Sequence, residues 1–321
     1  MATKTSTDLT LTDLIAQTHN DEFIPIVDTL MEEFEAVEDM VWVESNGPTQ
    51  HLYSQTLNEP SGTWRSINEG VDQERAQFKQ LSEQMAFLES FSQVDDRLIR
   101  IAKNKEKVRS NQDARFIAGM GKTFASAFTG TPAGAPLASK SFNGLRGRMN
   151  DISAANVYGA ADTGALTSLF IIQWGDSKVH MIYPAGWEHG LSKEDLGLDT
   201  VVDGDGKKYR AWLSRYELAS GLVINNTKNI ARVCNILSTD DIATSGVDDL
   251  LIEALNGMPG RGKGAVIYAD ISMLTQFDIA VKDKSNISFG ASEAFGRQIT
   301  DFLKRPVKLI EAIGVAESVV S

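Results

Sequence analysis

The feature that most constrains this chain is a helical pattern that runs through residues 105–129. Phe116, Met120, Phe124 and Phe128 recur every four residues, so they line one face of a helix. The glycine and the TPAGAP stretch that follow are typical stop signals. The pattern therefore predicts a long amphipathic helix whose apolar face is buried against another part of the protein.

The same segment contains GMGKT at residues 119–123, which resembles the end of the phosphate-binding loop G-x-x-x-x-G-K-[ST]. The position that should hold the first glycine is Phe116, and the residues upstream are charged and helix-favouring rather than a strand. We therefore favour a helix that tolerates Gly119 and Gly121, each of which costs about 1 kcal/mol there. Such glycines often mark close packing of another element. A nucleotide hydrolase is the remote alternative.

Residues 38–75 contain strand-like pieces that are separated by NGP and NEPSG turns. The pieces are Met40–Glu44, His51–Leu57 and Thr63–Ile67. Their apolar residues, including Trp42 and Trp64, are too sparse to build a core. The pattern predicts an extended hairpin that needs a neighbour to rest on.

The middle of the chain is rich in β-branched and aromatic residues. Residues 167–174 and 179–184 flank GDSK, and residues 199–202 and 209–218 flank DGDGKK, both of which look like hairpin turns. Together with GLVINN and IARVCNI they predict one antiparallel sheet with at least one solvated face.

The last eighty residues change character. They read as a helix at 247–257, a buried strand in GAVIYAD, a helix capped by Ser272 and a terminal strand in PVKLIEAI. This order predicts a separate α/β unit with a boundary near residues 238–245.

The residues that carry chemistry are sparse. The single cysteine, Cys234, excludes an intramolecular disulfide and fits a reducing cytoplasm, and the four histidines lack metal-binding spacing. A net charge of −12 argues against a dedicated DNA-binding or RNA-binding surface. We find no secretory signal pattern and no apolar run long enough for a membrane span. We therefore expect no enzyme activity, no cofactor and no bound metal.

Several longer stretches resemble the major capsid proteins of tailed bacteriophages, most closely those of short-tailed phages. The stretches are MVWVESN with SINEGV, LESFSQVDDRL, FNGLRGRMN, ANVYGAADTGALTSLFIIQWGDSKVHMIYPAGWEHGLSKEDLG and YRAWLSRYELASGLVINNTKNIARVCNI. The resemblance covers roughly residues 8–321.

The resemblance implies an α+β fold of the Hong Kong 97 type. It maps an N-terminal arm onto residues 1–37, an extended loop onto 38–75, a peripheral domain with a spine helix at about 105–129 onto 76–238, and an axial domain onto 239–321. In the family the axial domain precedes the closing strands of the peripheral sheet. Here strands 167–237 come before the α/β unit, so either the element order is permuted or the domain labels must be exchanged.

The resemblance also implies a function. The chain would assemble with itself into pentamers and hexamers of an icosahedral shell around double-stranded DNA, without sequence-specific binding. Its expected partners are a scaffolding protein, a portal and a decoration protein, and its expected locations are the host cytoplasm during assembly and then the virion. An encapsulin-like compartment is the main alternative. The residues expected at assembly or packing contacts are Trp42, Trp64, Phe116, Gly119, Met120, Gly121, Phe124 and Phe128.

Overall fold

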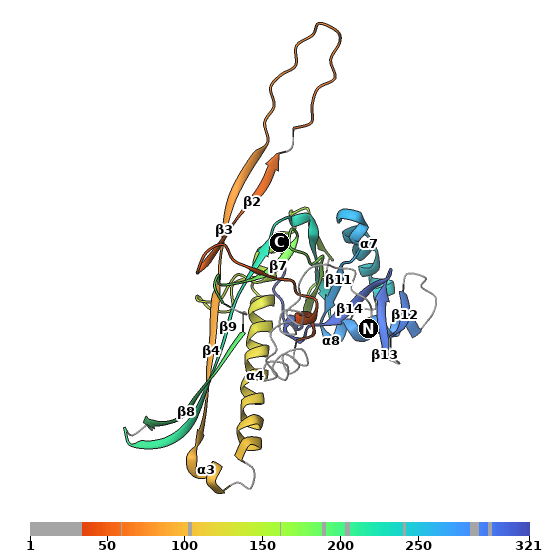
Figure 1. The fold of residues 1–321 in the computed structure, drawn as a ribbon. Coiled ribbons are helices and arrows are strands. Elements are labelled where there is room, and N and C mark those ends of the chain that lie inside the picture. The colour runs from red at the N-terminus through yellow and green to blue at the C-terminus, as the bar shows by residue number, and fades with distance from the viewer. Residues whose placement is uncertain are drawn as a thin grey trace.

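The fold consists of two β-sheets, a long helix and a hairpin that projects from them (Figure 1). It is taken from a computed structural model. The structure describes residues 34–58, 60–101, 105–160, 162–187, 191–202, 206–239, 242–282, 289–294 and 297–321. The helices expected at residues 8–20 and in most of 23–37 lie outside this range.

The first sheet has five strands around β9 (Lys208–Ile224). One edge of β9 pairs antiparallel with β4 (Ala86–Asp95). The other edge pairs antiparallel with β8 (Leu191–Val202) and β7 (Val179–Tyr183). β1 (Trp42–Glu44) then adds to β7 in parallel.

The long helix α4 (Lys105–Thr129) lies along this sheet and is preceded by α3 (Asp96–Ile101) (Figure 1). Burial alternates along β4: Phe87 and Phe91 are exposed, whereas Ser92 and Val94 are buried. The sheet therefore has one face under α4 and one exposed face along β4, as the sequence predicted for an antiparallel sheet.

The second sheet has seven strands. In spatial order they are β12 (Phe289–Ala294), β13 (Arg297–Phe302), β14 (Arg305–Leu309), β11 (Val266–Ala269), β6 (Leu166–Ile172), β10 (Ile230–Leu237) and β5 (Val157–Gly159). Leu169 and Ile171 of β6 belong to a core cluster with α7 (Val247–Gly257) and α8 (Ile271–Lys282). Phe170 and Ile172 point to the other face and join the core that contains α4. Because both faces are buried, β6 is buried along its whole length and ends in four consecutive apolar residues, 169–172.

Short elements complete the body of the molecule. They are η1 (Glu35–Glu38), α5 (Leu145–Arg148), η2 (Thr227–Asn229), α6 (Ile242–Ser245), η3 (Pro259–Gly262) and η4 (Glu311–Ile313).

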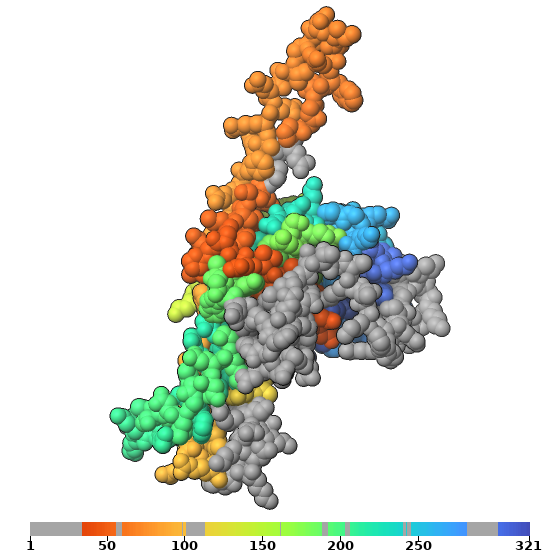
Figure 2. All heavy atoms as spheres, in the orientation of Figure 1, coloured from red at the N-terminus to blue at the C-terminus, as the bar shows by residue number. Residues whose placement is uncertain are grey.

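The projecting hairpin consists of β2 (Gln50–Asn58) and β3 (Gln77–Gln84), which pair antiparallel. Its tip, residues 60–76, has no regular strand and extends away from the body in both the ribbon and the space-filling view (Figures 1 and 2). Residues 50–84 thus form the extended hairpin, later in the chain than the expected 38–75.

The expectation of one antiparallel sheet across residues 167–237 was wrong. β6 and β10 belong to the seven-stranded sheet, whereas β7, β8 and β9 belong to the five-stranded one. The GDSK stretch does form a tight turn, with Gly175 N donating to Val179 O at 3.0 Å. The chain passes from one sheet to the other at this turn, so β6 and β7 do not pair as a hairpin.

Other local predictions also need correction. Met40–Glu44 contributes β1 to the body rather than a strand to the hairpin, and residues 63–67 form no strand. The cap of α8 is Asp270, whose carboxylate accepts from Ser272 N at 3.1 Å; Ser272 itself lies inside the helix.

Several predictions are confirmed. The long helix spans residues 105–129, α7 spans 247–257, and β8 and β9 form the hairpin that was predicted around DGDGKK. Because β5, β6 and β10 join β11–β14 in one sheet, that sheet crosses the boundary expected near residues 238–245. Strands β5, β6 and β10, which precede this boundary, therefore share a sheet with the strands that follow it.

Candidate assembly surfaces

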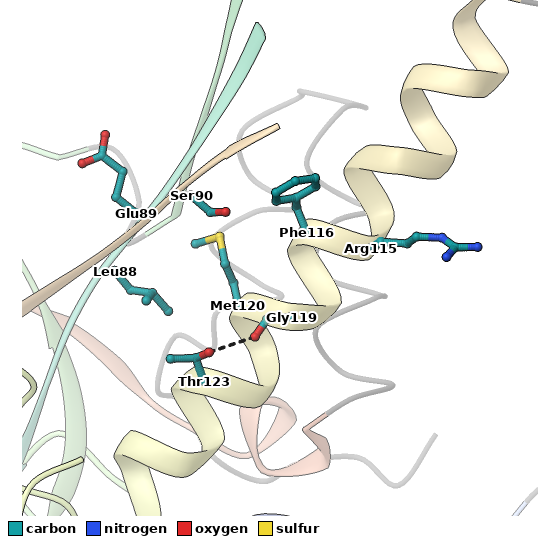
Figure 3. Close-up of a pocket in the computed structure, with 8 residues that line it drawn as sticks. All are labelled: Leu88, Glu89, Ser90, Arg115, Phe116, Gly119, Met120 and Thr123. Atoms are coloured by element: carbon teal, nitrogen blue, oxygen red, sulfur yellow. Dashed lines mark hydrogen bonds between the residues drawn. The ribbon is translucent and has the colours of Figure 1, made fainter. Parts of the chain in front are cut away.

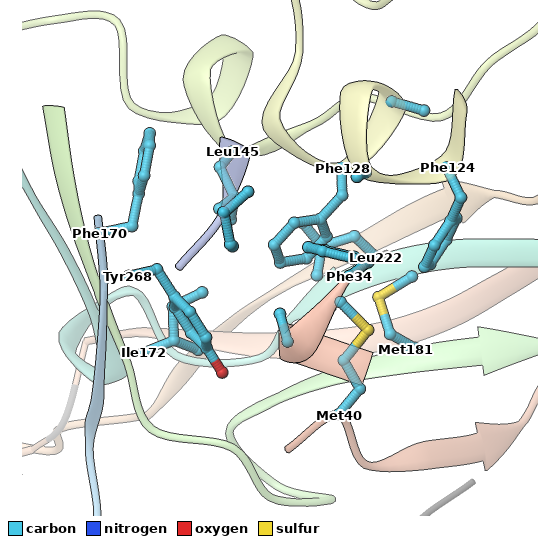
Figure 4. Packing of buried hydrophobic residues seen from close by; sticks show 14 of the residues in the cluster. Phe34, Met40, Phe124, Phe128, Leu145, Phe170, Ile172, Met181, Leu222 and Tyr268 are labelled. Carbon is cyan, nitrogen blue, oxygen red and sulfur yellow. The ribbon is translucent and has the colours of Figure 1, made fainter. Parts of the chain in front are cut away.

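The predicted apolar stripe of α4 packs into the core between the two sheets (Figure 4). Phe124 and Phe128 are buried and both contact Phe34, with ring centroids 5.7 and 5.6 Å away. Trp42 stacks on Phe124 at 6.3 Å, so it is a core residue of its own chain. Met120 is also buried.

The GMGKT stretch is helix throughout. Thr123 Oγ1 donates to Gly119 O at 3.0 Å, a bond between residues four apart along α4. Lys122 is exposed, and α4 begins at Lys105 with no strand before the motif. A phosphate loop needs a strand–loop–helix arrangement, so residues 119–123 do not form one.

A pocket of about 410 Å³ lies between α4 and β4. Figure 3 shows Leu88 and Ser90 of β4 facing Met120 and Phe116 of the helix. The full lining is Leu88, Glu89, Ser90, Arg115, Phe116, Gly119, Met120 and Thr123. Phe116 is only partly buried, so the apolar stripe of α4 ends at this pocket.

Gly119 opens onto the pocket rather than against a neighbouring element. A Cβ placed on it would meet no atom within 4 Å, other than neighbours in its own helix. Gly121 is buried on the same helix. Within this chain, Gly119 therefore has none of the close packing that we expected of it.

The base of the hairpin is fastened to the body by an ion pair. Arg148 of α5 donates through both terminal nitrogens to Glu83 of β3, at 2.7 and 2.6 Å, and also to Leu222 O at 2.9 Å. Tyr53 of β2 donates to Glu83 at 3.3 Å. Burial, with the adjacent Glu83 carboxylate, raises the pKa of Tyr53 to about 12. A bidentate arginine fixes the direction of the hairpin as well as its position.

Two histidines meet at the same junction. His51 of β2 and His180 of β7 lie edge to face with ring centroids 6.0 Å apart. Burial lowers the pKa of His180 to about 4, the nearby His51 acts in the same direction, and Asp176 opposes both. Burial also lowers the pKa of His51. Both rings are therefore neutral at pH 7.

The tip of the hairpin presents large apolar side chains to solvent. Trp64 is 100% exposed and Ile67 is 93% exposed. The loop is held by bonds to itself: Ser61 N and Gly62 N donate to Glu74 at 2.9 and 3.1 Å, and Ser66 N donates to Glu69 at 3.0 Å. An ordered loop that displays a tryptophan is typical of a surface that meets a partner.

A buried charge network joins α5, β10 of the seven-stranded sheet and the C-terminal segment, and no sequence pattern predicted it. Glu317 accepts from Arg146 at 2.5 Å and from Arg232 at 2.9 Å, and all three side chains are 1–2% exposed. Both guanidinium groups also donate to backbone carbonyls. Arg146 donates to Gly130 O at 2.8 Å, and Arg232 donates to Met149 O at 2.6 Å. Arg146 and Arg232 lie 171 and 85 residues from Glu317 in the sequence, so no local sequence pattern could predict that they pair.

The described residues contain no group of three or more His, Cys, Asp or Glu side chains placed to hold a metal ion. In the same part of the chain, no helix is long and apolar enough to cross a membrane.

Comparison with known proteins connects these surfaces to a family. The family model described as major capsid protein GP7 matches residues 18–321. A chain in the cryo-EM structure of bacteriophage Epsilon15 is similar, with a TM-score of 0.64, 22% identity and 88% coverage of both chains. A capsid chain of bacteriophage JBD30 has a TM-score of 0.49 and 9% identity, covering 98% of this chain and 97% of that one.

An encapsulin of Synechococcus elongatus PCC 7942 has a TM-score of 0.41 and 10% identity, covering 65% of this chain and 89% of that one. No curated protein matches the chain. The family match covers most of the chain, so the chain belongs to the family of major capsid protein GP7. Its α+β fold is of the Hong Kong 97 type, as the resemblance implied. It is a capsid shell protein of a bacteriophage virion, and the family is one of structural proteins.

Proposed function

We propose that copies of this chain form pentamers and hexamers of an icosahedral shell, in which the β2–β3 hairpin of each copy rests on an adjacent copy. The observation that carries the proposal is the exposed tip: Trp64 and Ile67 are displayed on a hairpin that has no core of its own. Burying such side chains between copies would release about 25 cal/mol for each Å² of apolar surface removed from water.

The domain division follows the same logic. We assign the N-terminal arm to residues 1–37 and the extended loop to the hairpin at 50–84. The peripheral domain then consists of α4 with the five-stranded sheet, and the axial domain consists of the seven-stranded sheet with α7 and α8. We assign β6 and β10 (residues 166–172 and 230–237) to the axial domain, because β6 pairs with both β10 and β11 in the seven-stranded sheet.

The enclosed molecule is double-stranded DNA, held without sequence-specific contacts. The net charge of −12 supports this, because a strongly basic inner wall would hold the genome through release of counterions. We further propose that a scaffolding protein, a portal and a decoration protein act with this chain, that assembly takes place in the host cytoplasm, and that the protein has no catalytic role.

The proposal is tested by expressing the full chain, alone and with a scaffolding protein, and examining it by negative-stain microscopy and sedimentation. We expect closed shells. A variant that lacks residues 60–75 but keeps β2 and β3 tests the role of the tip. It should remain folded and fail to close shells, in contrast to the complete chain. Monomers alone from the complete chain, even with scaffolding protein present, would contradict the proposal.

The contents of the shell test the second part. Shells purified from phage-producing cells should protect double-stranded DNA from nuclease. A shell that holds a protein cargo and no DNA would instead match the encapsulin-like alternative.

A further inference from the structure

The pocket beside α4 contains a helix glycine that nothing in the described chain requires. Gly119 lies well inside α4, where glycine is less favourable than alanine. Yet a Cβ at this position would meet no atom within 4 Å, apart from its own helix, so no neighbouring element in this chain excludes a side chain. The open volume of about 410 Å³ is therefore available to a group from outside the described fold.

The hairpin tip presents a side chain that suits such a pocket. Trp64 carries a flat apolar ring with one N–H donor, and it is entirely exposed. The tip stands well clear of α4 of its own chain (Figure 1). At about 3.3 Å per residue, the strand from Gln50 to the tip can reach on the order of 50 Å. Such a reach carries the tryptophan beyond its own body and onto an adjacent molecule.

We propose that the Trp64 indole of one copy occupies the pocket between α4 and β4 of a second copy. This inference rests on the proposed shell assembly and names its receptor site. Leu88, Phe116 and Met120 supply apolar walls. A methionine sulfur beside an aromatic ring is itself favourable. The Ser90 hydroxyl, which faces the helix, lies within the pocket as an acceptor for the indole N–H.

Charge supports the same pairing. The pocket lining carries Arg115 and Glu89, and Glu89 is already paired with Arg215, which leaves Arg115 to meet an acidic partner. The tip carries Glu69, Asp72 and Glu74 against two arginines, which makes residues 60–76 net acidic. The contact is also of the right symmetry class. The tip and the pocket are different surfaces, so each copy offers one and receives the other. Such head-to-tail contacts generate closed rings when the rotation closes, as pentamers and hexamers require.

A double-mutant cycle tests the contact. Trp64→Ala removes the ring and Gly119→Leu fills the pocket, and each should raise the protein concentration needed for assembly about tenfold or more. If both act on one contact, the double variant should be no worse than either single variant. Lys122→Leu, on an exposed position of the same helix, is the matched control and should assemble like the parent chain.

Gly119→Leu gives a second readout that separates assembly from folding. Because the new side chain enters open space in a helix, the unassembled variant should unfold at the same denaturant concentration as the parent or a higher one. Normal assembly of Gly119→Leu, or strictly additive effects in the cycle, would overturn the inference.

Photocrosslinking identifies the receptor directly. With p-benzoylphenylalanine in place of Trp64, irradiated shells should yield a link to the tryptic peptide 116–122, which contains Phe116 and Met120. Links only to other peptides would overturn the inference, and so would links to residues 1–33 with none to 116–122. If the parent chain forms no shells, the proposed function fails; if shells form without this link, only the inference fails.

Discussion

The seven-stranded sheet and the β2–β3 hairpin are both built from β-strands, but they bury their apolar side chains in different places. β6 is buried on both faces, against α7 and α8 on one side and the α4 core on the other. The hairpin leaves Phe78 65% exposed, and Trp64 and Ile67 at its tip are more exposed still. The sheet is therefore stabilised within one chain, whereas the hairpin leaves most of its apolar surface exposed in the single chain, and we propose that adjacent copies cover it. Mutations should separate these two contributions, and the expected changes below refer to the unassembled chain.

The largest effect should come from the buried charge network of Arg146, Arg232 and Glu317. Glu317→Ala leaves Arg146 and Arg232 buried without their carboxylate, which typically costs about 3–5 kcal/mol of unfolding free energy. Denaturant unfolding measures it. Glu311→Ala, at an exposed position of η4, is the control and should change the unfolding free energy by less than about 0.5 kcal/mol. A loss below about 1 kcal/mol for Glu317→Ala would show that the network does not stabilise the folded chain.

Acidification should produce the next largest effect, through the junction of hairpin and body. His180 has a folded pKa of about 4, below the model value of 6.5, so the unfolded chain binds its proton first. Stability from this residue is complete above pH 6.5 and falls as the pH drops from 6.5 towards 4, by roughly 3 kcal/mol at most. His180→Phe should flatten this part of the stability profile. An unchanged slope in the variant would assign the acid sensitivity to other groups.

The anchor of the hairpin should have a local effect. Arg148→Met removes the bidentate partner of Glu83, and we expect roughly 1–2 kcal/mol of lost local stability. Amide hydrogen exchange should accelerate in β2 and β3, with little change in β6. Lys79→Met, an exposed position on the same hairpin, is the control. Equal acceleration in both sheets would mean that the hairpin and the body open as one unit.

The smallest effect on the isolated chain should come from the tip. Ile67→Ser replaces a side chain that contacts solvent, so the unfolding free energy should change by less than about 0.5 kcal/mol. Assembly should weaken in the same variant, as measured by the fraction of protein that sediments as shells. A loss of 2 kcal/mol or more in unfolding would show that the tip packs within its own chain and would remove the contrast between the two regions.

The elements that could be predicted from sequence are those whose signals are local. The four-residue spacing of Phe116, Met120, Phe124 and Phe128 located α4, because the stripe and the glycine after it are both read within one segment. The assignment of strands to sheets failed at β6 and β7. A tight turn at GDSK has the same local chemistry whether the next strand pairs with the previous one or crosses to another sheet.

The candidate site could be predicted from the sequence only in part. Trp64 and Gly119 were singled out by residue type, but neither the exposure of the one nor the open space at the other could be read from neighbours in sequence. Arg146 and Glu317 are brought together by the fold alone, since 171 residues separate them.

The large sequence separations in this network also determine the order in which its residues are synthesised. Arg232 is translated 85 residues before the carboxylate that neutralises it, an interval of roughly 4 to 17 s at 5–20 residues per second. Until residue 317 has been synthesised, Arg146 and Arg232 lack the carboxylate that pairs with them in the core. A nascent chain therefore displays its hairpin before it has a finished body to dock, and the last part of the core to form also times when a subunit becomes competent to join a shell.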